Sequence, residues 1–302
     1  MGDDPATDRA ACDGAPAQVE PPAQRLEPPA DIDLPFFAYG VFKPGELAFF
    51  QLRDLVTRVA EADLPGGLRL RDGLPILVAG EPGSVGGAFL EFAPDDRPKA
   101  YDRISAMEPR SQYRWVDERS IDGRHANVLV GRHPTQSSDH LEGEWSSWDD
   151  PWFTEALDVV EETMNMPREG SWYAPLFRLQ MAYMLLWSSI EHYVSLRYCL
   201  GSRAAEKIDH LSAEDAFASA LRLHVTRTDK VHRVDHPTQT ANLVAASPAD
   251  SLRYYYQLRS NITHRGKRTL SESDRLSRAL RELLTVFRDV LAAAQEDAKR
   301  LA

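Results

Sequence analysis

The chain has 302 residues, a length that exceeds the usual size of one domain and favours two. With 43% hydrophobic and 27% charged residues, its composition is that of a globular protein and excludes a wholly disordered or fibrous chain. The formal net charge of -11 argues against a protein that coats nucleic acid nonspecifically. It leaves room for a local basic groove, because steering depends on where the charge lies.

The first 33 residues are rich in Ala, Pro and acidic residues, so we expect a disordered tail. They lack the basic start and apolar run of a secretion signal. The longest apolar stretch, Leu179–Ile190, is shorter than the roughly 20 residues that span a bilayer. We therefore expect a cytoplasmic protein without a membrane segment. Cys12 and Cys199 are too few for a disulfide framework or a cysteine-based metal site.

Residues 34–134 contain short apolar runs separated by Gly and Pro, a pattern typical of strands. The expected strands are Phe36–Val41, Leu74–Ala79, Ala88–Phe92 and Ala126–Val130. Apolar residues at helical spacing predict helices at Glu46–Ala62 and Pro98–Met107. The predicted fold is an α+β domain in which helices accompany a small, mixed, barrel-like sheet.

Residues 135–170 are predicted to form a polar linker and a short helix. Asp150 and Pro151 suit the N-cap and first turn of that helix. Three tryptophans, Trp145, Trp148 and Trp152, crowd this junction. They indicate a packing contact between domains, with a ligand-stacking platform as the alternative.

Residues 171–302 show helical periodicity. An apolar stripe that includes Leu176, Tyr183 and Ile190 predicts a long helix ending near Gly201. Three further helices are expected at Ala213–His224, Pro248–His264 and Glu272–Arg300. The predicted architecture is an all-α, antiparallel four-helix bundle or a close variant.

A candidate site in the N-terminal half begins at Tyr39-Gly40-Val41-Phe42-Lys43-Pro44-Gly45, directly after the first expected strand. Glycines here let backbone amides approach an anion, although a plain turn is an alternative. Two further segments follow, Gly87–Glu91 and Met107-Glu108-Pro109 with Gln112-Tyr113-Arg114-Trp115. In this order, the three segments resemble the gamma-glutamylcyclotransferase-like family over residues 34 to about 133.

The resemblance implies a reaction in which a γ-glutamyl amine attacks its own side-chain carbonyl and releases 5-oxoproline. Glu108 would be the catalytic carboxylate that moves the proton. The implied substrate-binding residues are Tyr39, Gly40, Val41, Phe42, Gly45 and Tyr113. Phe42 replaces the family's usual Leu and Pro109 its common Gly, so the identity of the substrate stays open. The alternative for Glu108 is a surface acid at a helix end.

A second candidate site lies in Tyr256–Lys267. Arg259 and His264 resemble the signature of HEPN ribonucleases, and Glu191 resembles their accompanying acid, over residues 171 to about 295. Five residues turn a helix through about 140°, so Arg259 and His264 cannot share one ideal face. They can meet if the helix ends near Thr263, or across a dimer of the bundle, which the resemblance favours. His264 would then move a proton from an RNA 2′-hydroxyl, and Arg259 would stabilise the transition state. The alternative is a polar cap on the bundle.

Basic residues around this segment suit an RNA backbone, and a solvated helix face is the alternative. Arg265, Lys267 and Arg268 are the predicted RNA-binding residues. The same run includes Arg253, Arg275, Arg278 and Arg281. A cluster of His and Asp between His224 and His236 lacks a metal-binding pattern. We expect no metal and no cofactor.

These features predict a two-module cytoplasmic enzyme, of the kind found among toxins and defence or stress effectors. The HEPN-like half would be a metal-independent endoribonuclease, and the N-terminal half would act on or sense a γ-glutamyl compound. The first alternative is a γ-glutamylamine cyclotransferase whose helical half only dimerises it. The second is a non-catalytic adaptor that binds RNA or protein. The expected partners are a small γ-glutamyl compound, RNA and a second copy of the chain, and the sequence identifies no antitoxin.

Overall fold

The computed structural model describes the chain from Arg25 onward, apart from several short segments. The positions left out are 1–24, 72, 135–138, 142–143, 168–172, 199–203, 235, 237, 266–272 and 302. Cys12, Cys199, Lys267 and Arg268 therefore lie outside the described residues. Within the described part, no helix combines the length and the hydrophobicity that crossing a membrane requires.

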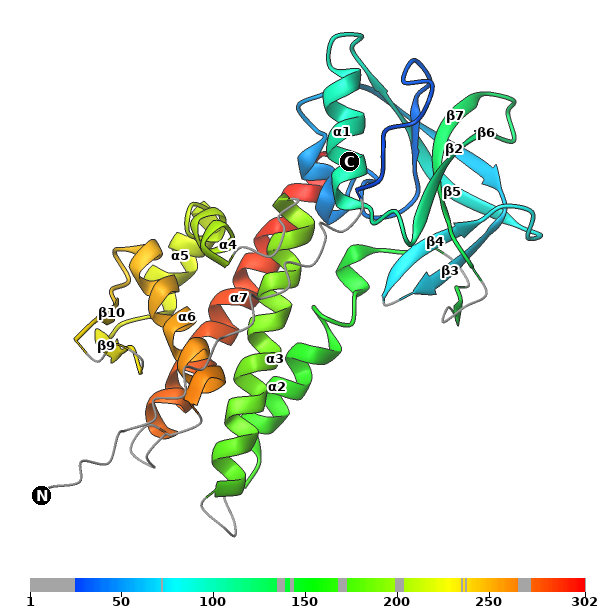
Figure 1. The fold of residues 1–302 in the computed structure, drawn as a ribbon. Helices are drawn as coiled ribbons and strands as arrows, with labels where there is room; N and C mark the ends of the chain where they lie inside the picture. Colours follow the sequence, from blue (N-terminus) through cyan, green and yellow to red (C-terminus); the bar gives the residue numbers. More distant parts are fainter. Residues whose placement is uncertain are drawn as a thin grey trace, which may run out of the picture.

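The N-terminal half is built around a five-stranded sheet with the order β2-β5-β1-β7-β6 (Figure 1). Its strands are β1 (Phe36–Ala38), β2 (Val56–Pro65), β5 (Ser84–Phe92), β6 (Tyr113–Arg119) and β7 (His125–Gly131). The central strand β1 runs antiparallel to β5 and parallel to β7. All three residues of β1 are buried, which explains why the sequence presents this strand as a continuous apolar run.

A second, three-stranded sheet has the order β4-β3-β8. It consists of β3 (Gly67–Arg71), β4 (Leu74–Val78) and β8 (Asp139–His140). Among the described residues the two sheets do not close into a barrel, because β2 and β6 occupy opposite edges of the larger sheet. The mixed sheet is therefore confirmed, whereas its barrel-like closure is not found.

The predicted helix at Glu46–Ala62 is wrong. In its place, a 3-10 helix, η1 (Leu47–Gln51), is followed by the long strand β2. β2 pairs with β5 along almost its full length, with Val59 opposite Leu90. Strand pairing thus overrides a helical spacing of apolar residues. The other predicted helix is confirmed as α1 (Arg97–Met107).

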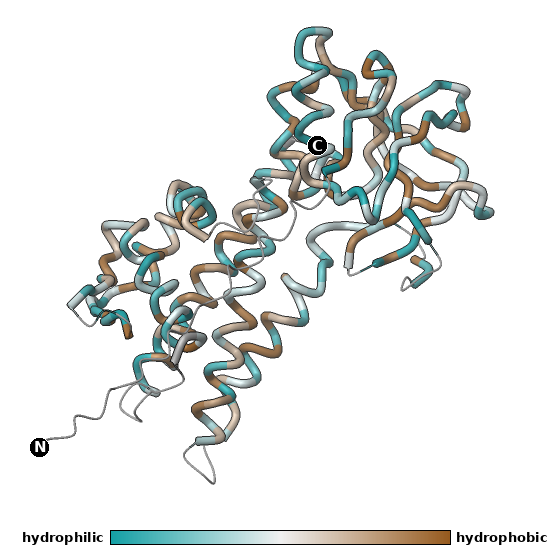
Figure 2. The backbone as a smooth tube through the Cα atoms, in the orientation of Figure 1, coloured by the Kyte–Doolittle hydropathy of each residue, from teal (hydrophilic) through white to brown (hydrophobic). Residues whose placement is uncertain are grey.

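The C-terminal half is mainly helical. Its helices are α2 (Glu155–Asn165), α3 (Tyr173–Tyr198), α4 (Ala204–Ser212), α5 (Asp215–His224), α6 (Pro248–Arg265) and α7 (Ser273–Leu301). The long helices α3 and α7 run side by side, with α2 against α3 and α5 against α7 (Figure 1). Apolar residues recur along both long helices (Figure 2), as burial against neighbouring helices requires.

Four helices thus appear close to where periodicity predicts them, but the half is not all-α. An antiparallel hairpin of β9 (Asp229–His232) and β10 (Thr240–Leu243) packs against α6. The short helix expected at Asp150 begins later, at Glu155, because Asp150 forms a turn in which its carboxylate accepts a hydrogen bond from the Trp152 amide at 2.9 Å.

The tryptophans of the junction contact both halves. Trp145 donates its indole N–H to the Gly73 carbonyl at 3.0 Å, and Trp148 donates to the Gly45 carbonyl at 2.9 Å. The Trp152 ring lies 6.0 Å from the ring of His192 in α3. These contacts match the packing role that the sequence predicts for the tryptophans.

Residues 25–33, which the sequence assigns to the tail, pack on the N-terminal half. Leu26 is buried, and Arg25 forms an ion pair with Asp102 of α1 at 2.6 Å. The Asn127 side-chain amide of β7 donates to the Asp31 carbonyl at 2.6 Å. This part of the predicted tail therefore contributes to the core around α1.

Candidate functional site

A cavity of about 200 Å³ opens in the N-terminal half. Its walls come from the segment after β1, from the start of β4, from the end of α1 and from α3. The lining residues are Phe36, Ala38, Tyr39, Gly40, Val41, Phe42, Leu74, Pro75, Met107, Glu108, Pro109, Gln112, Tyr113, Leu129 and Leu196. The volume lies below the roughly 300–1,000 Å³ of sites for drug-sized ligands, so the cavity suits a small molecule.

Glu108 is the only acidic side chain among these lining residues. It follows the last residue of α1, where the backbone turns from helix to extended geometry. Desolvation by burial raises the pKa of its carboxyl to about 8. No hydrogen bond or ion pair links it to another residue in the described part of the chain. An unpaired carboxyl with a pKa near neutrality is suited to proton transfer.

Two tyrosines fix the walls of the cavity. The Tyr39 hydroxyl donates to the Leu129 carbonyl at 2.7 Å and accepts from the Leu77 amide at 3.1 Å. Burial raises the pKa of this hydroxyl, so it stays neutral. The Tyr113 hydroxyl donates to the Pro75 carbonyl at 3.2 Å. Both rings therefore have fixed positions and tie the sheets to each other.

The segment after β1 needs glycine where it passes β4. A Cβ atom added at Gly40 would lie 2.8 Å from Cγ of Pro75, closer than real contacts allow. The segment is also anchored at its end, where the buried Glu46 carboxylate accepts from the amide and hydroxyl of Ser147 at 2.6 and 2.7 Å. The chain from Gly40 to Glu46 is therefore held at both ends.

The structure brings most of the predicted N-terminal residues together. Those that line the cavity are Tyr39, Gly40, Val41, Phe42, Glu108 and Tyr113. Gly45 does not line it, and instead adopts a left-handed turn with φ 89°. Sequence reasoning missed Pro75, Gln112 and Leu196 as lining residues. Gln112 lies beside a matched motif, whereas Leu196 carries no local signal because it belongs to the other half.

In the C-terminal half, Arg259 and Glu191 are neighbours. The Arg259 guanidinium lies 4.0 Å from the Glu191 carboxylate and over the ring of Tyr256. Glu191 also accepts from the Trp187 indole at 2.5 Å and lies 3.7 Å from the Lys207 ammonium. Nε of Arg259 is buried without a hydrogen-bond partner among the described residues. The predicted pair of Arg and supporting acid is thus assembled within one chain.

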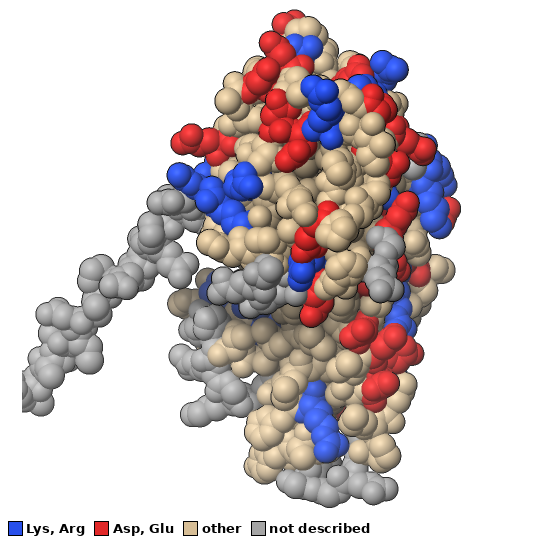
Figure 3. Space-filling view, turned by 90° about the vertical axis from the view of Figure 1, so that its right-hand side faces the viewer, with Lys and Arg blue, Asp and Glu red and all other residues tan. Residues whose placement is uncertain are grey.

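Several of the remaining predicted residues of this half lie outside the described part of the chain. His264 and Arg265 lie in the last turn of α6, but their side chains are outside the described part, as are Lys267 and Arg268 entirely. Of the wider basic run, Arg253 pairs with Asp209 and Asp250, while Arg275 pairs with Asp229. On the face drawn in Figure 3, basic side chains lie among acidic ones instead of forming a continuous basic surface.

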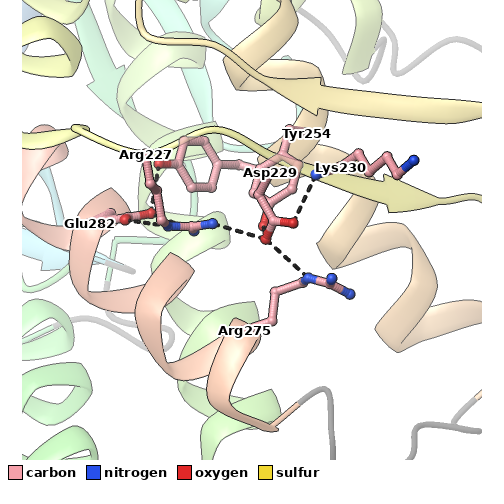
Figure 4. Close-up of polar contacts among 7 residues, drawn as sticks. Arg227, Asp229, Lys230, Tyr254, Arg275 and Glu282 are labelled. Carbon is pink, nitrogen blue, oxygen red and sulfur yellow. Dashed lines mark hydrogen bonds and ion pairs between the residues drawn. The ribbon is translucent and has the colours of Figure 1, made fainter.

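A polar cluster attaches the hairpin to the helices (Figure 4). Arg227 donates two hydrogen bonds to the Glu282 carboxylate of α7, at 2.7 and 2.8 Å, and a third to Asp229 at 2.8 Å. Asp229 also accepts from the Tyr254 hydroxyl at 2.9 Å and from Arg275 at 3.0 Å. Because hydrogen bonds to its charged form outweigh burial, the pKa of Asp229 is lowered. These mutual contacts indicate a structural role.

Comparison with known proteins identifies no family. No protein-family model matches the chain, and no curated protein matches it. Among solved structures, it is similar to the uncharacterized protein PH0828 from Pyrococcus horikoshii, with 19% identity over 44% of this chain and 99% of that chain. The TM-score of this match is 0.28, too low to support an assignment of fold or function.

Proposed function

We propose that the N-terminal cavity is the active site of a γ-glutamyl cyclotransferase-like enzyme that forms 5-oxoproline from a small γ-glutamyl compound. One observation supports this above all others. Glu108, with a pKa raised to about 8, lines a cavity of about 200 Å³ together with the Tyr39–Phe42 segment. The family resemblance assigns the proton transfer and the substrate contacts to these same residues.

The proposed reaction needs one proton carrier. The substrate α-nitrogen attacks the γ-carbonyl carbon, forming the ring C–N bond, and the bond from that carbon to the leaving amine breaks. Glu108 takes a proton from the attacking nitrogen and returns it to the leaving nitrogen, so no net proton is consumed. The backbone amides of Gly40 to Phe42 would stabilise the developing oxyanion.

The lining also favours a particular ligand chemistry. No Lys or Arg side chain is among the described residues that line the cavity, and most of the lining is apolar. A substrate amine pairs with Glu108, whereas a substrate carboxylate can meet backbone amides and the Gln112 side-chain amide but no charged partner. An amine in the cavity would lower the pKa of Glu108 and favour its basic form.

The test is release of 5-oxoproline from γ-glutamyl alkylamides and γ-glutamyl dipeptides. Replacing Glu108 with Gln keeps the shape of the side chain but removes the base, so turnover should fall by at least about 100-fold. The matched control is Glu162→Gln, at an exposed acid of α2. Near-normal product formation by the Glu108→Gln variant would show that the assigned role is wrong.

A second candidate function concerns the helical half, because Arg259 lies beside Glu191 there. We propose metal-independent RNA cleavage by a homodimer, with Arg259 and His264 in the roles that the HEPN resemblance implies. Cleavage should continue in chelator, leave a 2′,3′-cyclic phosphate and spare DNA, which lacks the 2′-hydroxyl. Arg259→Ala and His264→Ala should each abolish cleavage, whereas Arg253→Ala should not. RNA binding without cleavage by the wild type would favour the adaptor hypothesis.

A further inference from the structure

One wall of the N-terminal cavity belongs to the helical half of the protein. Leu196, near the end of α3, lines the cavity and is 9% exposed. It is the one lining residue from beyond position 129 in the described part of the chain. The cavity of the N-terminal half is therefore incomplete without α3.

The end of α3 is held in place against the segment that follows the Tyr39–Phe42 wall. The Gln51 side chain of η1 donates to the Arg197 carbonyl. The ring of Phe50 packs edge-on against Tyr198 at 5.6 Å, and the Arg197 guanidinium lies 4.3 Å from the centre of the Phe50 ring. Since Leu196 directly precedes Arg197, its side chain is positioned by contacts on the backbone beside it.

A series of ion pairs connects residues at the same junction. Arg197 lies 3.7 Å from Glu214 and 3.5 Å from Asp297, and Arg53 lies 3.7 Å from Asp297. The hydroxyls of Tyr193 and Tyr198 donate to Glu214. Residues fixed by such surrounding contacts define the shape of a site more closely than residues on a free loop.

We infer that Leu196 is a specificity-determining residue, which limits the length of the alkyl group that the cavity accepts on a γ-glutamyl amide. This inference rests on the proposed function, since it names the substituent that the same cavity recognises. Glu108 binds the polar end of the ligand, so the apolar remainder must pack on the apolar lining, which includes Leu196. The substrate class is therefore γ-glutamyl amides of short, uncharged alkylamines.

The experiment uses full-length protein and a series of γ-glutamyl n-alkylamides from methyl to octyl. Calorimetric binding is measured in the Glu108→Gln background, where turnover does not interfere and the Gln side-chain oxygen still accepts a hydrogen bond from the substrate amine. The Michaelis constant for 5-oxoproline release is measured with Glu108 intact, so that the length limit is read with the carboxylate present as well. Each methylene that fits should improve affinity about fourfold, up to the length at which the chain meets Leu196. Leu196→Ala removes three carbons and should move this limit to chains about two or three carbons longer. Leu196→Phe should move it to shorter chains.

Val194→Ala is the matched control, because Val194 is a buried residue of α3 that does not line the cavity. It should leave the length limit unchanged, and circular dichroism should show equal helix content in all variants. The inference fails if no member of the series binds, or if the limit is the same in the wild type and in both Leu196 variants. If the amides bind with a limit set by Leu196 but no 5-oxoproline forms, the proposed reaction fails while the specificity role stands.

Discussion

The raised pKa of Glu108 makes a prediction about stability that does not depend on knowing the substrate. An acid whose pKa rises from 4.5 to about 8 on folding binds more protons in the folded state than in the unfolded state between these values. The free energy of unfolding should therefore decrease as pH rises from about 4.5 to about 8. Below this window both states are protonated, and the contribution to stability is fully present.

Replacing Glu108 with Gln removes this dependence, since the amide stays neutral at every pH. The rise of this pKa from 4.5 to about 8 sets an upper limit of about 5 kcal/mol on the stabilisation of the variant relative to the wild type above pH 8. Near pH 4 the two proteins should be equally stable. Above pH 8 we expect a difference of about 2–5 kcal/mol in favour of Glu108→Gln.

The assay is urea unfolding of both proteins between pH 4 and 9, followed by fluorescence and circular dichroism. Glu162→Gln, at an exposed position, controls for the loss of one negative charge. A stability difference that stays constant across this range would refute the argument, because it would mean that folding does not desolvate the Glu108 carboxylate. A ligand amine in the cavity should reduce the difference, since it favours the charged carboxylate.

Three further predictions concern packing and assembly. Gly40→Ala should destabilise the protein by about 1–3 kcal/mol and weaken ligand binding, because its Cβ would lie 2.8 Å from the ring of Pro75. Gly86→Ala is the control, because the atom nearest to its added Cβ is 3.6 Å away, and thermal unfolding should show only a small loss of stability for it. Arg227→Ala should cost about 1–3 kcal/mol, because it leaves the partly buried Glu282 carboxylate without its cation, while Asp229 keeps its ion pair with Arg275. Arg222→Ala, at an exposed position, should change the melting temperature little. Sedimentation should show a homodimer whenever RNA is cleaved, and an active monomer would contradict the proposed dimer.

Local sequence order was sufficient to predict much of the N-terminal cavity. Strand β1 is a continuous apolar run, β7 is mostly apolar, and α1 ends directly before Glu108, so the motif residues fall at the ends of elements. The segment from Val56 was misassigned because its apolar residues match a helix in spacing, whereas its partner β5 lies about 30 residues away in sequence. Strand pairing over such a distance in sequence is not visible in the local pattern of apolar residues.

The contribution of α3 to the cavity could not be predicted for a related reason. The hydrogen bond that joins Gln51 to Arg197 connects positions 146 residues apart. The periodicity of apolar residues predicts a helix, but it does not predict which distant segment that helix packs against. Leu196 fits the apolar pattern of α3 as an ordinary core residue. That Leu196 lines the cavity, instead of packing in the helical core, follows only from the way the two halves pack.

The arrangement of α3 connects the two proposed sites. Glu191, beside Arg259, and Leu196, in the wall of the cavity, are five positions apart on the same helix. A ligand that presses on Leu196 acts on a helix whose neighbouring turn holds Glu191, so binding in the cavity and the position of Glu191 share one rigid element. If the two proposed activities are coupled, α3 is the physical connection between them, and Leu196 substitutions should then change RNA cleavage as well as the length limit of the cavity. If the activities are independent, the same substitutions should leave RNA cleavage unchanged.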